Sequence, residues 1–214
     1  MKERPILFSA PMVRAILDGS KTQTRRVVKR SSRFPFDFVG GNGQINDPTC
    51  WGFECAETAQ WWVLQTDGDE SLRQIPCPYG QPGDRLWVRE TYADIGPRLT
   101  YRADTDDGAH CVVQRWTPAI HMFRADSRIL LEIVSVRVER LQDISQDDAR
   151  AEGITDGDCV NCGEPEAKCA CSFPMPDYRD AYCNLWETIN GAGAWDANPW
   201  VWVVEFKRAS AGKE

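Results

Sequence analysis

Gly19-Ser20-Lys21-Thr22-Gln23-Thr24-Arg25-Arg26 is the stretch of this sequence that says most about its fold and its chemistry. It follows an amphipathic segment, residues 11–17, which is predicted to be a short helix capped by Ser9 and ended by Asp18-Gly19. Residues three apart share one side of a turn, so a turn here brings the Lys21 amine near the Thr24 hydroxyl. An amine and an alcohol in a positive field suit activation of the hydroxyl or binding of an anion. A solvated basic loop is the alternative interpretation.

Length and composition are those of a globular domain. The chain has 214 residues, of which 42% are hydrophobic and 27% charged, enough for one large domain with a real core. No apolar run reaches the roughly 20 residues of a membrane span, and the charged start leads into no signal-peptide core. We therefore expect a cytoplasmic protein that does not associate with a membrane.

Charge is distributed unevenly along the chain. The net charge is −7, yet residues 1–34 hold nine Lys or Arg against two acidic residues, a net of +7, and the remainder carries −14. A basic segment in an acidic protein can focus a phosphate-bearing ligand onto one site while the rest of the surface repels bulk nucleic acid. A solvated charge run stays open as the alternative.

Segments with strand periodicity outnumber the helical ones. Strands are predicted over residues 6–8, 85–90, 99–102, 111–115, 128–141 and 200–207. In the longest of them Ile129, Leu131 and Ile133 share one face, and in the last one Trp200, Trp202, Val204 and Phe206 do. Two further helices are predicted over residues 145–152 and 178–189, the first capped by Ser145 and ended by Gly153.

Residues 31–81 lack either periodicity and are rich in Gly, Asp, Gln and aromatic residues. We interpret them as an insertion, a loose hairpin or long loop, and not as a second domain. Many short strands with few helices predict an α+β fold: a single domain, residues 1–214, built on a small mixed β-barrel with flanking helices.

Four of the nine cysteines, Cys159, Cys162, Cys169 and Cys171, fall within thirteen residues. Four thiolates converging from a loop, about residues 156–176, match the tetrahedral demand of structural zinc, which leaves no open position for chemistry. Only one residue separates Cys169 from Cys171, so disulfides or unligated thiols stay open. The others are expected mainly to pack in the core, although Cys50, Cys55 and Cys77 could form an incomplete second cluster.

Other candidate groups give weaker signals. Trp87 could close a small pocket, and Glu90 could be buried near the site or form a rim salt bridge to Arg89 or Arg102. His110 and His121 lie in separate segments and are interpreted as structural or surface residues. Residues 40–43, a glycine-rich run, precede no helix and lack the lysine of a nucleotide-binding loop.

The stretch 19–25 resembles the signature of the ASCH domain family, relatives of the PUA RNA-binding barrel. Two further segments agree in order: residues 141–153 resemble the strand-to-helix segment that carries the family's glutamate, and residues 202–207 resemble its last strand. With residues 77–84 and 195–200, the whole chain is also similar to longer ASCH proteins of phages and prophages. The resemblance covers residues 5–30, 82–153 and 178–207 and implies a PUA-like β-barrel.

Within this family the site motif is most similar to that of the bacterial N-acetylcytidine amidohydrolases. The resemblance implies that Lys21, Thr24 and Glu152 are catalytic, and we expect Arg25, Arg26, Trp87 and Glu90 to bind substrate. Thr24 would be the nucleophile, Lys21 the base once burial and nearby arginines lower its pKa, and Glu152 the acid. A Lys21–Glu152 salt bridge that only fixes the loop is the alternative. The insertion, the cysteine loop and the second arginine depart from the family pattern.

Three functions follow as hypotheses. The first is an amidohydrolase acting on an acylated cytosine or related modified nucleoside. The second is a module that binds single-stranded RNA or a modified nucleobase without turnover. The third, a metal-independent ribonuclease, lacks a histidine pair to support it. Structural zinc is the only cofactor expected, with no catalytic cofactor, and the sequence identifies no protein partner.

Overall fold

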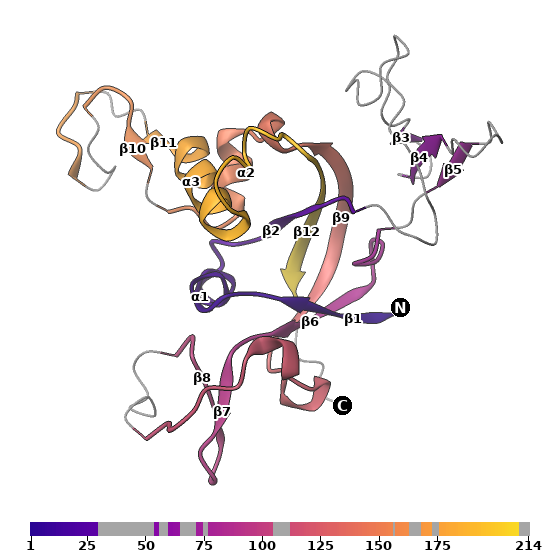
Figure 1. Cartoon of the computed structure of the whole chain (residues 1–214), viewed down its shortest axis with the longest axis vertical. Coiled ribbons are helices and arrows are strands. Elements are labelled where there is room, and N and C mark those ends of the chain that lie inside the picture. The colour runs from indigo at the N-terminus through magenta and orange to yellow at the C-terminus, as the bar shows by residue number, and fades with distance from the viewer. Residues whose placement is uncertain are drawn as a thin grey trace.

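The computed structural model of the chain describes residues 1–29, 54–55, 60–64, 72–74, 77–104, 112–155, 157–162, 168–172 and 176–209. Its central feature is a five-stranded sheet in the order β1-β6-β9-β12-β2. These strands are β1 (Glu3–Leu7), β2 (Gln23–Val27), β6 (Arg85–Arg89), β9 (Leu130–Arg140) and β12 (Trp200–Arg208). Strand β1 is parallel to β6, and every other neighbouring pair is antiparallel. The two long strands, β9 and β12, curve strongly (Figure 1).

The α-helices among the described residues are α1 (Ala10–Asp18), α2 (Gln146–Ala151) and α3 (Tyr178–Asn190). Helix α1 joins the edge strands β1 and β2, while α2 and α3 lie together against one face of the sheet (Figure 1). Ser145 caps α2 as predicted, with its hydroxyl accepting a hydrogen bond from the Asp148 amide at 3.0 Å. Ser9 occupies the N-cap position of α1, but its side chain makes no capping bond there.

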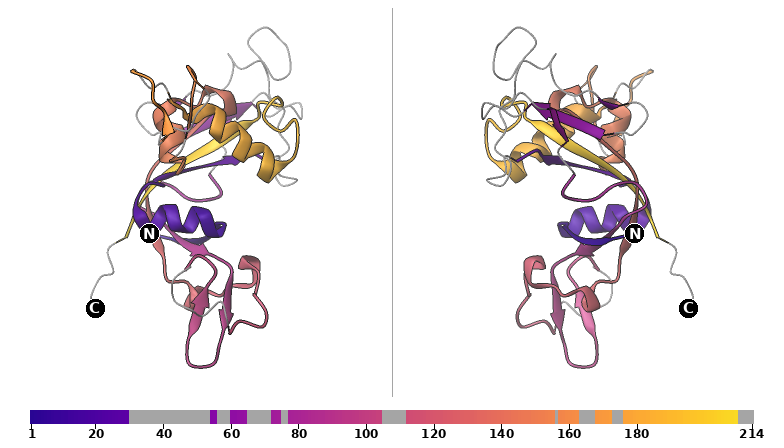
Figure 2. Two further views of the ribbon diagram at one scale, coloured as in Figure 1. Left: turned by 90° about the vertical axis from the view of Figure 1, so that its left-hand side faces the viewer. Right: turned by 90° about the vertical axis from the view of Figure 1, so that its right-hand side faces the viewer.

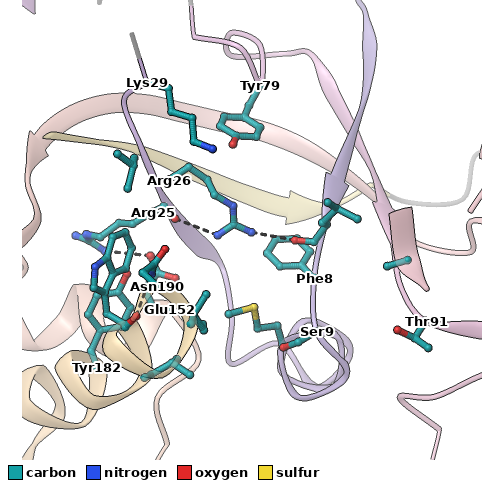
Figure 3. Close-up of a pocket in the computed structure, with 17 residues that line it drawn as sticks. Phe8, Ser9, Arg25, Arg26, Lys29, Tyr79, Thr91, Glu152, Tyr182 and Asn190 are labelled. Atoms are coloured by element: carbon teal, nitrogen blue, oxygen red, sulfur yellow. Dashed lines mark hydrogen bonds and ion pairs between the residues drawn. The ribbon is translucent and has the colours of Figure 1, made fainter. Parts of the chain in front are cut away.

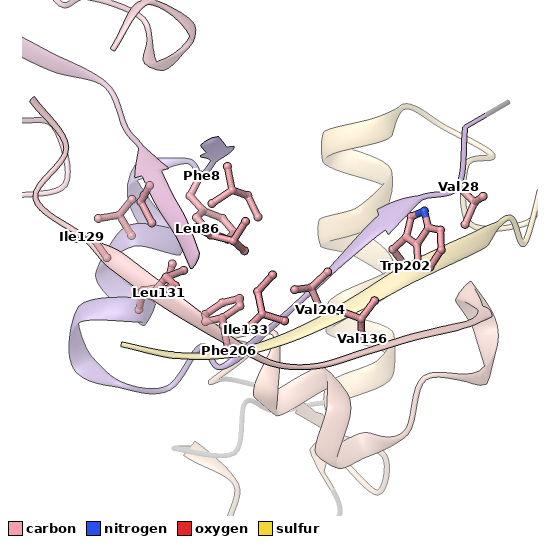
Figure 4. Close-up of a cluster of buried hydrophobic side chains, with 14 of the residues drawn as sticks. Phe8, Val28, Leu86, Ile129, Leu131, Ile133, Val136, Trp202, Val204 and Phe206 are labelled. Carbon is pink, nitrogen blue, oxygen red and sulfur yellow. The ribbon is translucent and has the colours of Figure 1, made fainter. Parts of the chain in front are cut away.

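Strand β12 is buried on both faces, which places it at the centre of the core. Trp200, Trp202, Val204 and Phe206 point into one apolar cluster with residues of β6, β9 and α1 (Figure 4). Val201 and Val203 point the other way and pack against α2 and α3. Both the predicted face of β12 and the predicted face of β9 are confirmed. In β9 the register shifts opposite Glu205–Phe206 and leaves Val134 50% exposed, so that Val136 and Val138 return to the core.

The sheet is open at one place. In the described part of the chain no backbone ladder joins the edge strands β1 and β2. Instead Arg26 of β2 donates from Nη2 to the Leu7 carbonyl of β1 at 2.9 Å. The structure therefore confirms an α+β fold with a mixed sheet, few helices and a cysteine-rich loop, and its described strands do not close a barrel.

Strands β7 (Tyr92–Asp94) and β8 (Leu99–Tyr101) form a hairpin that projects away from the sheet (Figure 2). Short 3₁₀ turns η3 (Ala119–His121) and η4 (Arg124–Asp126) follow it, and η5 (Leu141–Asp143) follows β9. The strand predicted over residues 111–115 was wrong for residues 112–115, which form a turn and a bend. His121 lies exposed in η3, while His110 lies outside the described residues.

Within the predicted insertion, β3 (Glu54–Cys55), β4 (Gln60–Leu64) and β5 (Leu72–Gln74) form a separate antiparallel sheet. The glycine-rich run at residues 40–43 and Cys50 lie outside the described residues. Two short paired strands, β10 (Asp158–Cys159) and β11 (Pro176–Asp177), form the base of the cysteine-rich loop. No helix in the described ranges is both long and apolar enough to cross a membrane.

Candidate functional site

The Lys-Thr motif is folded tightly between α1 and the end of α2. Gly19 ends α1 with a φ of 88°, a conformation that favours glycine. The Lys21 amide then donates to Ala15 O and the Thr22 amide to Ala151 O, each at 2.9 Å. Gly153, which also has a positive φ, lies so close that an added Cβ would approach Lys21 Cβ to 3.1 Å. This close packing brings the Lys21 backbone into a β-bridge with Glu152.

Lys21 and Glu152 form a buried ion pair. The distance from Lys21 Nζ to Glu152 Oε2 is 2.6 Å, and the same ammonium donates to the Glu152 carbonyl at 2.8 Å. The two side chains are 1% and 4% exposed, so water screens neither charge. Burial lowers the pKa of Lys21, and the positive charges of Arg26 and Arg25 add to this effect, while the Glu152 carboxylate offsets part of it.

Arg25 connects this pair to a second group of acids. Its side chain is fully buried, and its guanidinium contacts Glu152 at 3.3 Å, Asp148 at 3.2 Å and Glu139 through Nε at 3.0 Å. The guanidinium also lies 5.9 Å from the ring centre of Tyr182. Three carboxylates inside the protein therefore compensate the positive charge of Arg25. The predicted binding of substrate by Arg25 would involve a guanidinium that is already paired.

Thr24 lies on strand β2, opposite Val204 of β12, and not in a turn as predicted. Its side chain is fully buried, and its hydroxyl accepts a hydrogen bond from Arg26 Nη1 at 2.8 Å. Lys21 Nζ and the Arg26 guanidinium lie 5.7 Å and 5.3 Å from the same ring, that of Phe8. The motif's amine and the guanidinium that binds the Thr24 hydroxyl thus lie near one aromatic side chain.

A pocket of about 480 Å³ opens where β1 and β2 diverge (Figure 3). That volume falls within the roughly 300–1,000 Å³ of small-molecule sites. Its walls come from β1, α1, β2, the segment before β6, and α3. The aromatic lining residues are Phe8, Tyr79, Tyr182 and Trp186, and the charged ones are Arg25, Arg26, Lys29 and Glu152. This combination suits a flat ring that carries polar or anionic substituents.

Arg25, Arg26 and Glu152 line this pocket. Lys21 and Thr24 are buried behind it and are not among its lining residues, but each binds a residue that is: Lys21 binds Glu152, and Thr24 binds Arg26. Trp87 and Glu90 are not among its lining residues. Glu90 is buried and binds Arg128 through both carboxylate oxygens, at 2.9 and 3.1 Å, and the Arg89 guanidinium lies over Trp87. Substrate binding by Trp87 and Glu90 stays a prediction.

Among the aromatic and charged lining residues, sequence reasoning missed Phe8, Lys29, Tyr79, Tyr182 and Trp186. Lys29 was counted only as part of the basic segment, and Tyr79 only as part of the insertion and of the segment 77–84. Tyr182 and Trp186 lie four apart on α3, a spacing that predicts a shared face but not what that face meets. Their role depends on tertiary contacts far apart in sequence.

The cysteine loop converges as predicted. The sulfur atoms of Cys159, Cys162, Cys169 and Cys171 all lie within 4.8 Å of one another and could hold a metal ion. The Cys162–Cys169 sulfur separation is 3.7 Å. A disulfide needs about 2.05 Å, whereas two thiolates on one tetrahedral zinc, each with a Zn–S bond of about 2.3 Å, lie about 3.8 Å apart. These distances fit a shared metal and not a disulfide.

Comparisons with protein-family models, with curated proteins and with solved structures found no match to this chain. What the pocket and the cysteine loop do is therefore inferred from their residues and geometry.

Proposed function

We propose that the pocket is the active site of an amidohydrolase that removes an acyl group from an acylated cytosine or a related modified nucleoside. The observation that carries this proposal is the buried Lys21–Glu152 pair, whose carboxylate lines an aromatic pocket, together with the buried Thr24 hydroxyl, which is held by Arg26 of the same pocket lining. A buried base whose pKa is lowered, placed near a hydroxyl, is the arrangement that covalent acyl transfer requires.

The reaction begins with a proton shift inside the pair. Lys21 passes its proton over the 2.6 Å contact to Glu152, which leaves a neutral amine and a protonated carboxyl group. The acyl carbonyl replaces Thr24 as the acceptor of Arg26, so the guanidinium stabilises the developing oxyanion. The released Thr24 hydroxyl gives its proton to Lys21 as its oxygen bonds to the acyl carbon.

Collapse of this intermediate breaks the carbon–nitrogen bond. Glu152 gives its proton to the departing cytosine amine, which restores the original charges of Lys21 and Glu152. Lys21 then passes its proton to Glu152 a second time, and water attacks the Thr24 ester as Lys21 takes a proton from it. As the acid leaves, Glu152 returns its proton to the Thr24 oxygen. Lys21 and Glu152 act in turn as base and acid, and the net charge of the site stays the same throughout.

This proton shift predicts a bell-shaped pH dependence of kcat/KM. The active pair holds one shared proton; a second proton at low pH removes the base, and loss of the shared proton at high pH removes the acid. Because burial lowers the pKa of Lys21, the alkaline decline should fall below the ordinary lysine value of 10.5. A kcat/KM that still rises at pH values where ordinary lysines titrate would contradict this assignment.

We also propose that the curved sheet is an ASCH-type, PUA-like barrel. The three segments that carry the resemblance meet at one place: β2 pairs with β12, and Lys21 bridges to Glu152 at the end of α2. In this proposal Arg26 and the pocket take the place of a ladder between β1 and β2, which leaves an opening for a ligand.

A second candidate function is favoured by one observation. Thr24 is fully buried and already paired with Arg26, as expected of a site that recognises a modified nucleobase or RNA without reacting with it. Chromatography of N-acetylcytidine and of a short single-stranded RNA after incubation with the protein separates the candidates. Release of cytidine supports the amidohydrolase, cleaved RNA supports a ribonuclease, and binding without product supports the reader.

For the cysteine loop we propose one structural zinc ion bound by Cys159, Cys162, Cys169 and Cys171. Protein purified without chelator should contain one zinc per chain, and Cys162→Ser should lower that ratio markedly. Chelation should loosen residues 157–172 and leave the unfolding of the main sheet nearly unchanged, because no strand of the five lies in the loop. Cys183→Ser, a cysteine on α3 outside the cluster, is the control. Wild-type protein without stoichiometric metal would overturn the assignment.

A further inference from the structure

The charges that line the pocket are of two kinds. Arg25 contacts carboxylates, so its charge is compensated within the protein. Arg26 and Lys29 differ, because no carboxylate pairs with either within the described ranges. Arg26 uses three of its five N–H groups, all on neutral acceptors: Thr24 Oγ1, Arg25 O and Leu7 O. Two uncompensated cations therefore line this pocket, in a protein whose net charge is −7.

Tyr79 supplies a third donor on the same side of the pocket as Lys29 and Arg26 (Figure 3). Its hydroxyl makes no hydrogen bond to any described residue. Burial raises the pKa of Tyr79, so the phenol keeps its proton at neutral pH and can donate. A tight turn positions it: the Gly80 amide donates to Cys77 O at 3.1 Å, and the Arg4–Asp84 ion pair packs closely against Gly80.

We propose that Arg26, Lys29 and Tyr79 form a phosphate subsite, so that the pocket takes a nucleoside monophosphate in preference to a nucleoside. Two cations with free N–H groups and one free hydroxyl match the negative charge and the acceptor oxygens of a phosphate ester. The aromatic side chains of Phe8, Tyr182 and Trp186 provide the apolar surface for the nucleobase. A volume of about 480 Å³ suits one nucleotide and not an extended strand.

This inference names the substrate class of the proposed active site, but its test measures binding and does not require turnover. Cytidine and cytidine 5′-monophosphate, neither of which carries an acyl group, are titrated into the wild-type protein by calorimetry at low and high salt. The monophosphate should bind about 10- to 100-fold more tightly at low salt, and this advantage should shrink as salt rises. Equal binding of the two ligands, or no binding of either, would overturn the subsite.

Variants assign the subsite to its residues. Lys29→Gln should reduce the advantage of the monophosphate by about tenfold, and Tyr79→Phe by about two- to tenfold, with little change for cytidine itself. Lys207→Gln, which removes an exposed lysine of β12 outside the pocket, should change neither affinity. An advantage that survives both Lys29→Gln and Tyr79→Phe would overturn the assignment.

Two further results separate this inference from the others. If a short single-stranded RNA binds more than about tenfold tighter than the monophosphate, the two cations bind the RNA backbone, and the proposal of a mononucleotide ligand is overturned. Hydrolysis of acylated nucleosides by a protein without phosphate preference would refute the subsite and leave the proposed enzyme intact. Phosphate preference without hydrolysis would support the subsite and refute the proposed enzyme.

Discussion

Glu152→Ala should lower the free energy of unfolding by about 3–5 kcal/mol, because it leaves two buried cations without this partner. Lys21 is almost fully buried, and Glu152 is the carboxylate that it contacts in the structure. Arg25 loses one of its three carboxylates but keeps Glu139 and Asp148. Most of the cost therefore arises at Lys21. Chemical denaturation of both proteins at neutral pH measures the difference.

A second substitution tests the cause. Lys21→Met removes the orphaned charge and fills similar space, so the double variant Lys21→Met with Glu152→Ala should recover a large part of the lost stability. Glu152→Gln keeps the shape of the side chain and should cost less than Glu152→Ala. If the free energy of unfolding of Glu152→Ala lies within about 1 kcal/mol of the wild-type value, the buried pair contributes less to stability than this prediction requires.

Thr24→Ala should abolish turnover of an acylated nucleoside, by about ten-thousandfold or more in kcat, while the ligand still binds. The hydroxyl matters only when the bond to the acyl carbon forms, so the ground-state complex loses little. Steady-state kinetics and equilibrium binding on the same preparation measure the two effects separately.

Thr24→Ser is the matched control, since it keeps a hydroxyl that can accept from Arg26 and attack the acyl carbon. It should retain measurable turnover. A non-catalytic site predicts a different pattern, in which Thr24→Ala changes ligand binding by one hydrogen bond at most, about 0.5–1.5 kcal/mol, and no variant releases product.

Alternating hydrophobic residues and a helix-capping residue correctly predicted strand β12 and the start of helix α2. Trp200, Trp202 and Val204 alternate with Val201 and Val203, and both sets are buried because β12 has the sheet interior on one face and α2 and α3 on the other. Ser145 with Asp148 predicted the start of α2 correctly. The strand expected at residues 112–115 was wrong, since a short β-rich run without a partner strand forms no ladder.

The sequence could point to candidate site residues but not to their geometry. The sequence pointed to Lys21, Thr24 and Glu152, and it expected a turn where the structure has strand β2. That difference arises because β12 supplies a partner ladder for Gln23–Val27, a contact between residues about 180 positions apart. The burial of Arg25 by Glu139 and Asp148, and the pocket wall formed by α3, depend on equally distant contacts.

Release of cytidine from N-acetylcytidine is the direct measure of whether this site breaks an acyl–nitrogen bond. Wild-type protein should release cytidine and acetate continuously over many turnovers, and Thr24→Ala should release none above the uncatalysed rate. Wild-type protein that binds the acylated nucleoside, shown by titration on the same sample, yet never releases cytidine would contradict the account.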